Sequence, residues 1–320
     1  MTAALRVGTR GSALARWQTD QVRARIHEAG SRTERVEIRT TGDEVQHVPL
    51  SRIGSRALFT RQIDDALLEG RIDLAVHSLK DLPTTLPAGI ALVAVAERED
   101  PRDALVGRGP LQWSELPEGA VLATSSLRRR AQLLHLRPDL DVRDVRGNVD
   151  TRLAKLDANA EWSAILLAVA GLVRLGLGDR IGQRLPPELM LPAPGQGALA
   201  VTARTGDAAA AEAARRAVHH PPTAVAVAAE RAFLRTLEGG CQVPVAALAE
   251  RAPGGRLRLR GRVTSLGGER GVEGAEERAL AEVHEADALG VALADRLLGE
   301  GAASILAEVR AATAPGVSEP

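Results

Sequence analysis

The sequence predicts an α/β protein made of two similar lobes, followed by a smaller α+β domain. Short apolar runs alternate with helical periodicity over residues 5–95, and the same alternation returns over residues 104–190. This alternation is typical of layered α/β folds with largely parallel strands. A polar junction with a proline at 99–103 and a Pro/Gly-rich junction at 192–197 mark points where the chain crosses between lobes. Two crossovers are the usual design of a hinged two-lobe binding protein.

The first lobe is predicted from residues 5–96. Its expected strands are 5–9, 36–40, 73–77 and 90–96, each a short apolar run. Its expected helices are 12–29, with Ser12 as a capping residue, and 58–68.

The second lobe repeats this order of elements. Its expected strands are 121–124, 142–145 and 164–169, and its expected helices are 127–136, 150–156 and a short one ending at 175. A strand at 198–203 follows the second junction and would return to the first lobe.

The remaining chain has a different pattern. We expect a helix at 223–237, antiparallel strands at 245–249 and 256–264, and a long Ala/Leu-rich helix at 288–312. The predicted domains are 1–98 with 197–217, then 99–196, then 218–312, and a frayed tail at 313–320.

The composition argues against several classes of protein. Lys and Arg together number 41, as do Asp and Glu, so the chain has no basic excess for general binding to nucleic acid or membranes. No apolar run of about 18 residues predicts a membrane span, and no secretory pattern opens the sequence. The single cysteine excludes an intramolecular disulfide and is compatible with a reducing compartment. We expect a cytoplasmic protein, and a monomer.

Basic and hydroxyl side chains follow several predicted strands. The group includes Arg10, the segment 124–130 with Arg128 and Arg129, and Arg146 with Arg152. Ligands bind at the carboxyl ends of strands in open α/β sheets, where helix N-termini and arginine forks favour carboxylates or phosphates. The alternative is that these arginines are solvated surface charges, and it is the more common state for any single one. No Gly-x-x-x-x-Gly-Lys-Ser/Thr loop is present, which argues against nucleotide hydrolysis.

Two further residues can carry chemistry. Lys80 and Asp81 follow a buried strand, and a carboxylate in a basic cleft can stabilise a developing cation or move a proton. The alternative is a surface ion pair in the turn before Pro83. His77, inside the apolar run, is expected to be a packed core residue, because no His or Cys stands at metal-ligand spacing from it.

The lone thiol lies in a glycine-rich loop. Gly239 and Gly240 precede Cys241 and permit a ligand to approach the backbone closely. Most lone cysteines are inert core residues, but a loop position is typical of functional groups. A cysteine protease is a poor alternative, since no histidine is specified as its base.

Taken together, the chain resembles the porphobilinogen deaminase family from about residue 5 to 310. Eight motifs carry the resemblance in the family's order, at 7–15, 75–83, 97–104, 124–129, 145–153, 167–172, 191–198 and 237–244. The resemblance implies two lobes of the type 2 periplasmic-binding-protein kind around a cleft, plus a third domain. It also implies a dipyrromethane cofactor held through a thioether to Cys241, on which four porphobilinogen units are joined with loss of ammonia.

The resemblance also assigns roles to single residues. Asp81 would be catalytic, stabilising the electron-poor pyrrole cation and transferring protons. The implied cofactor-binding residues are Cys241, Lys80, Thr124, Ser125, Ser126, Arg128, Arg129, Arg146, Gly147 and Ala170. The implied substrate-binding residues are Arg10, Ser12, Arg56, Phe59, Arg152 and Gln196.

One segment departs from the family pattern. The family often has Gly-Lys-Gly-Leu-Phe where this chain has Ser55-Arg56-Ala57-Leu58-Phe59. Arg56 keeps the charge, but Ser55 and Ala57 allow less backbone freedom than glycine. By resemblance, 42–54 is expected to form a mobile lid.

Two other functions are alternatives to that of an enzyme. A two-lobe anion-binding protein without catalysis would need neither Cys241 nor Asp81, and it would usually be exported. A deaminase-like protein without activity, acting as a partner or regulator, would not need to retain both residues.

Overall fold

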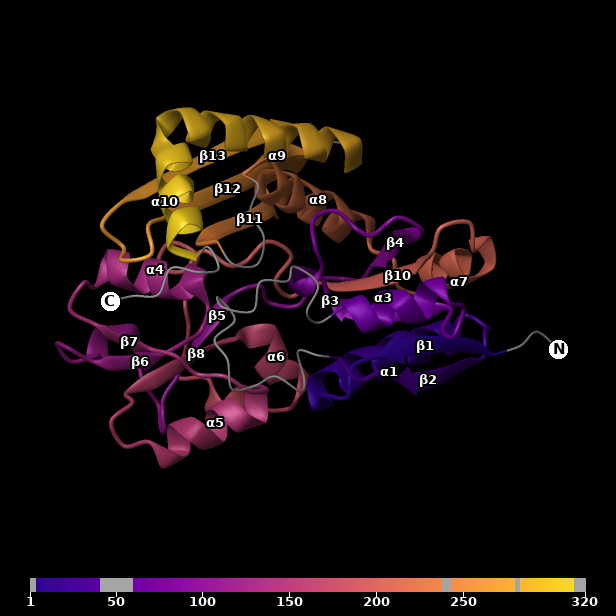
Figure 1. The fold of residues 1–320 in the computed structure, drawn as a ribbon, viewed down its shortest axis with the longest axis horizontal. Helices are drawn as coiled ribbons and strands as arrows, with labels where there is room; N and C mark the ends of the chain where they lie inside the picture. The colour runs from indigo at the N-terminus through magenta and orange to yellow at the C-terminus, as the bar shows by residue number, and fades with distance from the viewer. Residues whose placement is uncertain (1–3, 41–59, 238–242, 280–282, 314–320) are drawn as a thin grey trace.

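The computed structural model describes residues 4–40, 60–237, 243–279 and 283–313, which form two α/β lobes and a third domain that packs against both (Figure 1). Each of the three parts contains its own sheet. In this described part of the chain, no helix is both long and apolar enough to cross a bilayer.

The first lobe has a five-stranded sheet covered on both faces. The strand order is β2 (Thr33–Glu37), β1 (Leu5–Thr9), β3 (Leu74–Ser78), β10 (Leu199–Arg204) and β4 (Ile90–Val95). Helices α1 (Ala13–Glu28) and α7 (Ala208–Val218) pack on one face through Val22, Ile26 and Ala214. Helix α3 (Arg61–Leu68) packs on the other through Ile63 and Leu67.

The second lobe has the same plan. Its strand order is β7 (Asp141–Arg143), β6 (Val121–Ala123), β8 (Ala164–Ala168), β5 (Asp103–Val106) and β9 (Gln183–Arg184). Helices α5 (Val149–Ala158) and α6 (Val169–Arg174) cover one face, and α4 (Leu127–Leu136) covers the other. Short 3-10 turns lie at Trp113–Glu115 and Gly178–Arg180.

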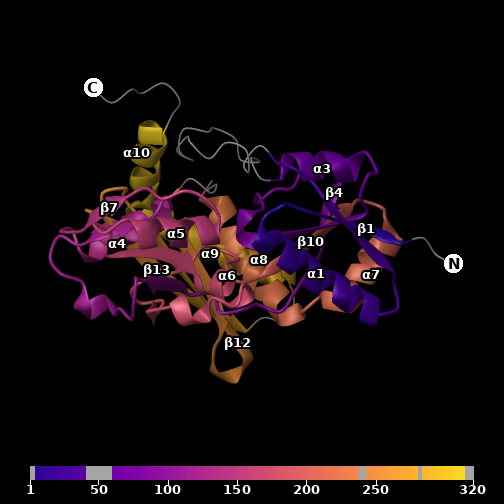
Figure 2. The same ribbon diagram turned by 90° about the horizontal axis from the view of Figure 1, so that it is seen from below.

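The two sheets share one topology. In each, the strand that arrives from the other lobe, β10 or β5, inserts fourth in the order and runs antiparallel to its neighbours. The other pairings are parallel. This arrangement confirms the predicted fold class of two type 2 lobes with hinge crossovers. The crossovers are residues 96–102 and 185–198, and Figure 2 shows the lobes side by side with α6 near α1.

The third domain is an antiparallel sheet backed by helices. The strands β11 (Val245–Arg251), β12 (Arg256–Thr264) and β13 (Gly271–Ala279) pair in chain order, with a 3-10 turn at Pro253–Gly255. Helices α8 (Pro221–Thr236), α9 (Val283–Leu297) and α10 (Ala303–Thr313) share a core with it. A Cβ at Gly290 would lie 2.3 Å from the Ala229 carbonyl oxygen, so this glycine permits the close packing of α9 on α8.

Most predicted elements are present, with some differences. The strand predicted at 36–40 forms three residues earlier, and β5, β13 and α7 were not predicted. The sequence of β13 is rich in Gly, Ala and Glu, so its strand conformation depends on pairing with β12. The long C-terminal helix begins at Val283 and is interrupted over Leu298–Ala302, where Gly301 has a φ of 115°.

The domain boundaries stay a prediction from the sequence. The presence of three separate sheets supports them. Tail residues 314–320 lie outside the described residues.

A buried carboxylate joins the crossovers to the third domain. Glu230 on α8 has no exposed surface and accepts hydrogen bonds from the Arg98 guanidinium at 2.6 and 3.1 Å. It also accepts from the backbone N–H groups of Gly195 and Ala249, both at 2.7 Å. Arg98 and Gly195 belong to different crossovers, so one side chain holds both of them against β11.

We expect Glu230→Gln to lower the free energy of unfolding by about 3–5 kcal/mol, because it leaves the largely buried Arg98 without its counter-charge. Urea unfolding followed by circular dichroism measures the loss. The control is Glu212→Gln, which removes an exposed ion pair to Arg215 and should cost about 0–1 kcal/mol. Equal effects from the two substitutions would contradict the role of Glu230.

Candidate active site

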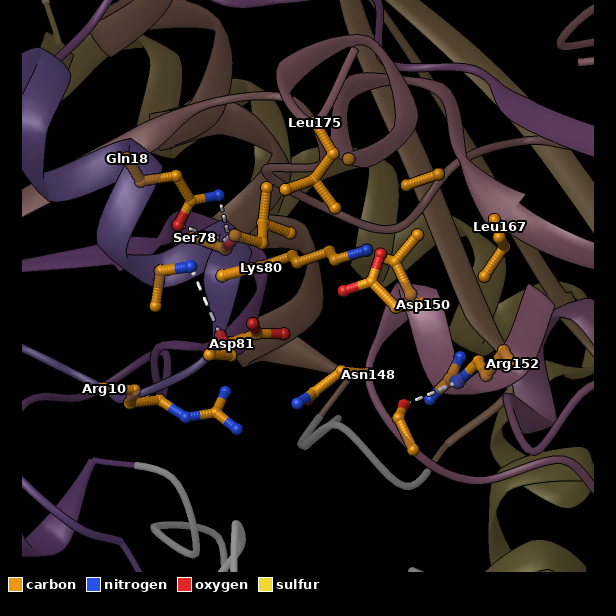
Figure 3. Close-up of a pocket in the computed structure, with 18 of the residues that line it drawn as sticks. Arg10, Gln18, Ser78, Lys80, Asp81, Asn148, Asp150, Arg152, Leu167 and Leu175 are labelled. Atoms are coloured by element: carbon orange, nitrogen blue, oxygen red, sulfur yellow. Dashed lines mark hydrogen bonds between the residues drawn. The ribbon is translucent and has the colours of Figure 1, made fainter. Parts of the chain in front are cut away.

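A cavity of about 300 Å³ lies between the two lobes. Figure 3 shows Arg10, Lys80 and Asp81 of the first lobe projecting into the same space as Asn148, Asp150 and Arg152 of the second. Eight of the residues predicted from the sequence line it: Arg10, Ser12, Lys80, Asp81, Arg129, Arg146, Gly147 and Arg152.

The first lobe places its side chains through the ends of two parallel strands. Arg10 follows β1, and the 3-10 turn Leu79–Asp81 follows β3, so both lie at the carboxyl edge of the sheet. Leu79 is fully buried and anchors this turn, while Lys80 and Asp81 reach the cavity. Ser12 caps α1 by accepting a hydrogen bond from the Ala15 N–H at 3.2 Å.

The second lobe contributes the loop after β7 and the start of α5. Gly147 has a φ of 120°, and a Cβ there would lie 2.6 Å from the Thr151 side chain, so the tight turn requires glycine. Arg152 donates from Nε to the Gly147 carbonyl oxygen at 2.8 Å. This bond fixes the guanidinium beside Arg146 at the cavity.

Positive charge exceeds negative charge among the described residues that line the cavity. The five cations are Arg10, Lys80, Arg129, Arg146 and Arg152, and the two carboxylates are Asp81 and Asp150. Burial, reinforced by Arg129, lowers the pKa of Lys80 to about 8. Burial and the nearby Arg129 and Arg146 lower the pKa of Arg152 to about 10. A partly buried site with excess positive charge favours a ligand that carries several negative charges.

Asp103, the first residue of β5, is a further charged residue of this region that no sequence pattern marks. Its carboxylate is fully buried and accepts from Arg128 at 2.7 Å, from Arg129 at 2.7 and 3.0 Å, and from the Gln196 amide at 2.9 Å. These donors outweigh the cost of burial and hold the pKa of Asp103 well below its usual range. A single Asp gives no sequence signal of its own, because its partners come from distant segments.

Six predicted residues lie behind the cavity rather than on its lining. Ser125 exchanges hydrogen bonds with the Val145 backbone at 2.9 and 3.1 Å, Thr124 Oγ1 accepts from the Ser126 N–H at 3.2 Å, and Ser126 caps α4. Ala170 is buried on α6. Arg128 and Gln196 are buried against Asp103.

Three predicted residues, Arg56, Phe59 and Cys241, lie outside the described residues, as does the expected lid at 42–54.

His77 lies on β3 and packs largely inside the first lobe. Its Nε2 lies 3.1 Å from the Thr202 hydroxyl, and burial together with the Arg10 charge lowers its pKa from 6.5 to about 4. The imidazole is therefore neutral in the fold, as a packed core histidine should be.

We expect this histidine to make the fold acid-sensitive. Between pH 6.5 and about 4 the unfolded chain binds a proton at His77 that the folded chain does not. Stability therefore falls as the pH drops through this range, by up to roughly 3 kcal/mol. Urea unfolding across this range should show a shallower pH dependence for His77→Gln than for the parent. The exposed His27→Gln is the control, and a parent-like slope in His77→Gln would contradict the prediction.

Comparison with known proteins agrees with this geometry. Residues 5–212 match the family model "Porphobilinogen deaminase, dipyromethane cofactor binding domain", and residues 224–299 match "Porphobilinogen deaminase, C-terminal domain". A distant likeness among solved structures is the methionine-binding protein MetQ, with 13% identity and a TM-score of 0.41 over 67% of this chain and 87% of that one.

Curated relatives match nearly end to end. Porphobilinogen deaminases of Desulforudis audaxviator and Rubrobacter xylanophilus are each 53% identical, over 95% and 97% of this chain and 97% and 99% of theirs. That of Geobacter metallireducens is 47% identical over 95% of this chain and 94% of its own length. With two family models and these relatives covering almost all of its length, the chain belongs to the porphobilinogen deaminase family.

Proposed function

We propose that the chain is a hydroxymethylbilane synthase, as its family membership indicates. It condenses four porphobilinogen molecules head to tail on a cysteine-linked dipyrromethane primer, releases ammonia at each addition, and frees hydroxymethylbilane by hydrolysis. This places it in tetrapyrrole biosynthesis. The observation that carries the proposal is the cavity between the lobes, with five cations from both sides and Asp81 among them.

The described residues fit the cofactor. A dipyrromethane carries an acetate and a propionate on each ring, and the described lining of the cavity has five cations against two carboxylates to receive them. When bound, the group supplies a nucleophilic pyrrole carbon to which the chain is joined. We propose Cys241 as its attachment point.

The proposed binding residues divide into a nearer and a farther set. Lys80, Arg129, Arg146 and Arg152 reach the cavity and would pair with carboxylates, while the Gly147 loop shapes the wall. The farther set does not line the cavity and supports these positions; it comprises Thr124, Ser125, Ser126, Arg128 and Ala170. Arg10, Ser12, Arg152 and Gln196 are proposed to serve the incoming substrate, together with Arg56 and Phe59.

Asp81 is proposed as the catalytic carboxylate. Porphobilinogen loses ammonia from its aminomethyl carbon as the ring nitrogen donates its electron pair, which leaves a positive pyrrole N–H. A carboxylate at this point stabilises that charge and can accept the proton lost when the new carbon–carbon bond forms. Asp81 lies on a turn anchored by buried Leu79, so its position in the cavity is set by the core of the first lobe.

We further propose that the protein is a cytoplasmic monomer that binds neither nucleic acid nor membranes. The balance of 41 basic and 41 acidic residues supports it.

Intact mass of the purified protein tests the primer. We expect an excess over the polypeptide mass equal to one dipyrromethane, and none in Cys241→Ser, because only a thiol can form the thioether. If the measured mass equals that of the polypeptide alone, the protein is incubated with porphobilinogen and its mass is measured again. If no pyrrole adduct then forms, the enzyme proposal fails and the alternative of a non-catalytic anion-binding protein gains support.

Replacing the Asp81 carboxylate by an amide tests the catalytic assignment. Asp81→Asn should lower kcat for hydroxymethylbilane formation by roughly 10²–10⁴-fold, the usual contribution of a positioned acid–base group. The matched control is Asp150→Asn, which removes the other carboxylate of the cavity and should cost much less. Equal losses in the two variants would mean that only the charge of the cavity matters and would refute the special role of Asp81.

A further inference from the structure

The buried carboxylate of Asp103 stands at the meeting point of both crossovers. It opens β5 directly after residues 96–102, and its partner Gln196 belongs to the second crossover. Its other partners, Arg128 and Arg129, lie in the first turn of α4. Asp103 therefore joins segments that are far apart in the chain and that belong to both links between the lobes.

Hydrogen-bond chemistry fixes the orientation of the Gln196 amide. Its nitrogen donates to the Asp103 carboxylate at 2.9 Å and to the Pro101 carbonyl oxygen at 2.7 Å. Both partners are acceptors only, so the amide cannot flip. The amide oxygen is consequently turned toward the Lys80 ammonium, which donates to it at 3.1 Å.

The result is one chain of contacts from lobe to lobe. Lys80 extends from the first lobe and Arg129 from the second, and both line the cavity. Gln196 and Asp103, which do not line it, connect the two cations from behind. We call Lys80, Gln196, Asp103, Arg128 and Arg129 the Asp103 network.

We propose that Asp103 is a positioning residue that sets the two cavity cations of opposite lobes, Arg129 directly and Lys80 through Gln196. Its use in catalysis rests on the proposed function, since carboxylates of the primer or product would be held by these cations. The positioning itself does not, and it can be measured without porphobilinogen.

A simpler alternative is that Asp103 only neutralises two buried arginines. In that role Asp103 would act on Lys80 through its charge alone, so Asp103→Asn would shift the pKa of Lys80 equally with and without Gln196. The groups that act on the Lys80 ammonium are Arg128 and Arg129, which disfavour the charged form, and Asp81 and Asp103, which favour it. Positioning through Gln196 adds a hydrogen bond that also favours the charged form.

The sequence makes the measurement simple, because it contains only two lysines, Lys80 and Lys155. Lys155 is exposed on α5 and serves as the internal standard. The full-length protein is pulse-labelled with acetic anhydride between pH 6 and 11, and the two lysine peptides are quantified by mass. The midpoint of Lys80 labelling reports its pKa, and the midpoint is insensitive to reagent access.

We expect Gln196→Met, which keeps the side-chain volume but has no strong acceptor, to shift the Lys80 midpoint downward. Asp103→Asn should shift it in the same direction, and by less in a Gln196→Met background, where the link from Asp103 to Lys80 is already lost. A shift of about one pH unit would make Lys80 roughly tenfold more reactive below its midpoint. The control Asp100→Asn removes a neighbouring carboxylate that pairs with Arg102 and Arg184, outside the network, and should leave the midpoint in place.

An unchanged midpoint in folded Gln196→Met overturns the proposal, whether or not Asp103→Asn folds. An equal shift in Asp100→Asn overturns it as well, because any nearby charge would then suffice. Measurements in the parent and in a Cys241→Ser background should agree in direction. A shift in a protein that never acquires pyrrole mass would leave the positioning intact while the proposed function fails.

Discussion

Much of this structure depends on one constraint, which is that the Asp103 carboxylate is buried and must stay ionised. A buried carboxylate needs donors on both oxygens, and here they come from α4 and from the second crossover. The first turn of α4, the start of β5 and residue 196 must therefore meet at one point. The same requirement brings the cations of the two lobes to a common cavity.

A second buried carboxylate extends this arrangement to the third domain. Glu230 binds Arg98 of the first crossover, Gly195 of the second and Ala249 of β11. Arg262 of β12 adds a contact to Gln132 on α4, at 2.8 Å. The hinge segments are thus held by specific polar bonds in addition to apolar contacts such as that of Leu191 with Ala246 and Leu248, so a change in lobe geometry would have to act on these bonds.

The described lining of the cavity carries an excess of positive charge, which suits its proposed function. Among the lining residues that the structure describes, folding places five cations against two carboxylates, and burial lowers the pKa values of Lys80 and Arg152. Such a site is costly without a ligand and gains most from one with several carboxylates. Asp81 lies among these cations, which disfavour a positively charged pyrrole. Its carboxylate offsets their effect and stabilises that charge.

The sequence by itself determined the fold class, most strands and helices, and the segments that build the cavity. Hydrophobic periodicity and capping signals are local, and Ser12 and the α4 boundaries illustrate how well they specify elements. The pairing of β13, the break at Gly301 and the antiparallel entry of β5 and β10 depend on neighbours distant in the chain. Motifs placed Arg128, Arg129 and Gln196 at the site, but only the tertiary structure decided that they surround Asp103. The physical reason is that a buried charge is balanced by whichever segments the fold brings to it, and no local pattern records that.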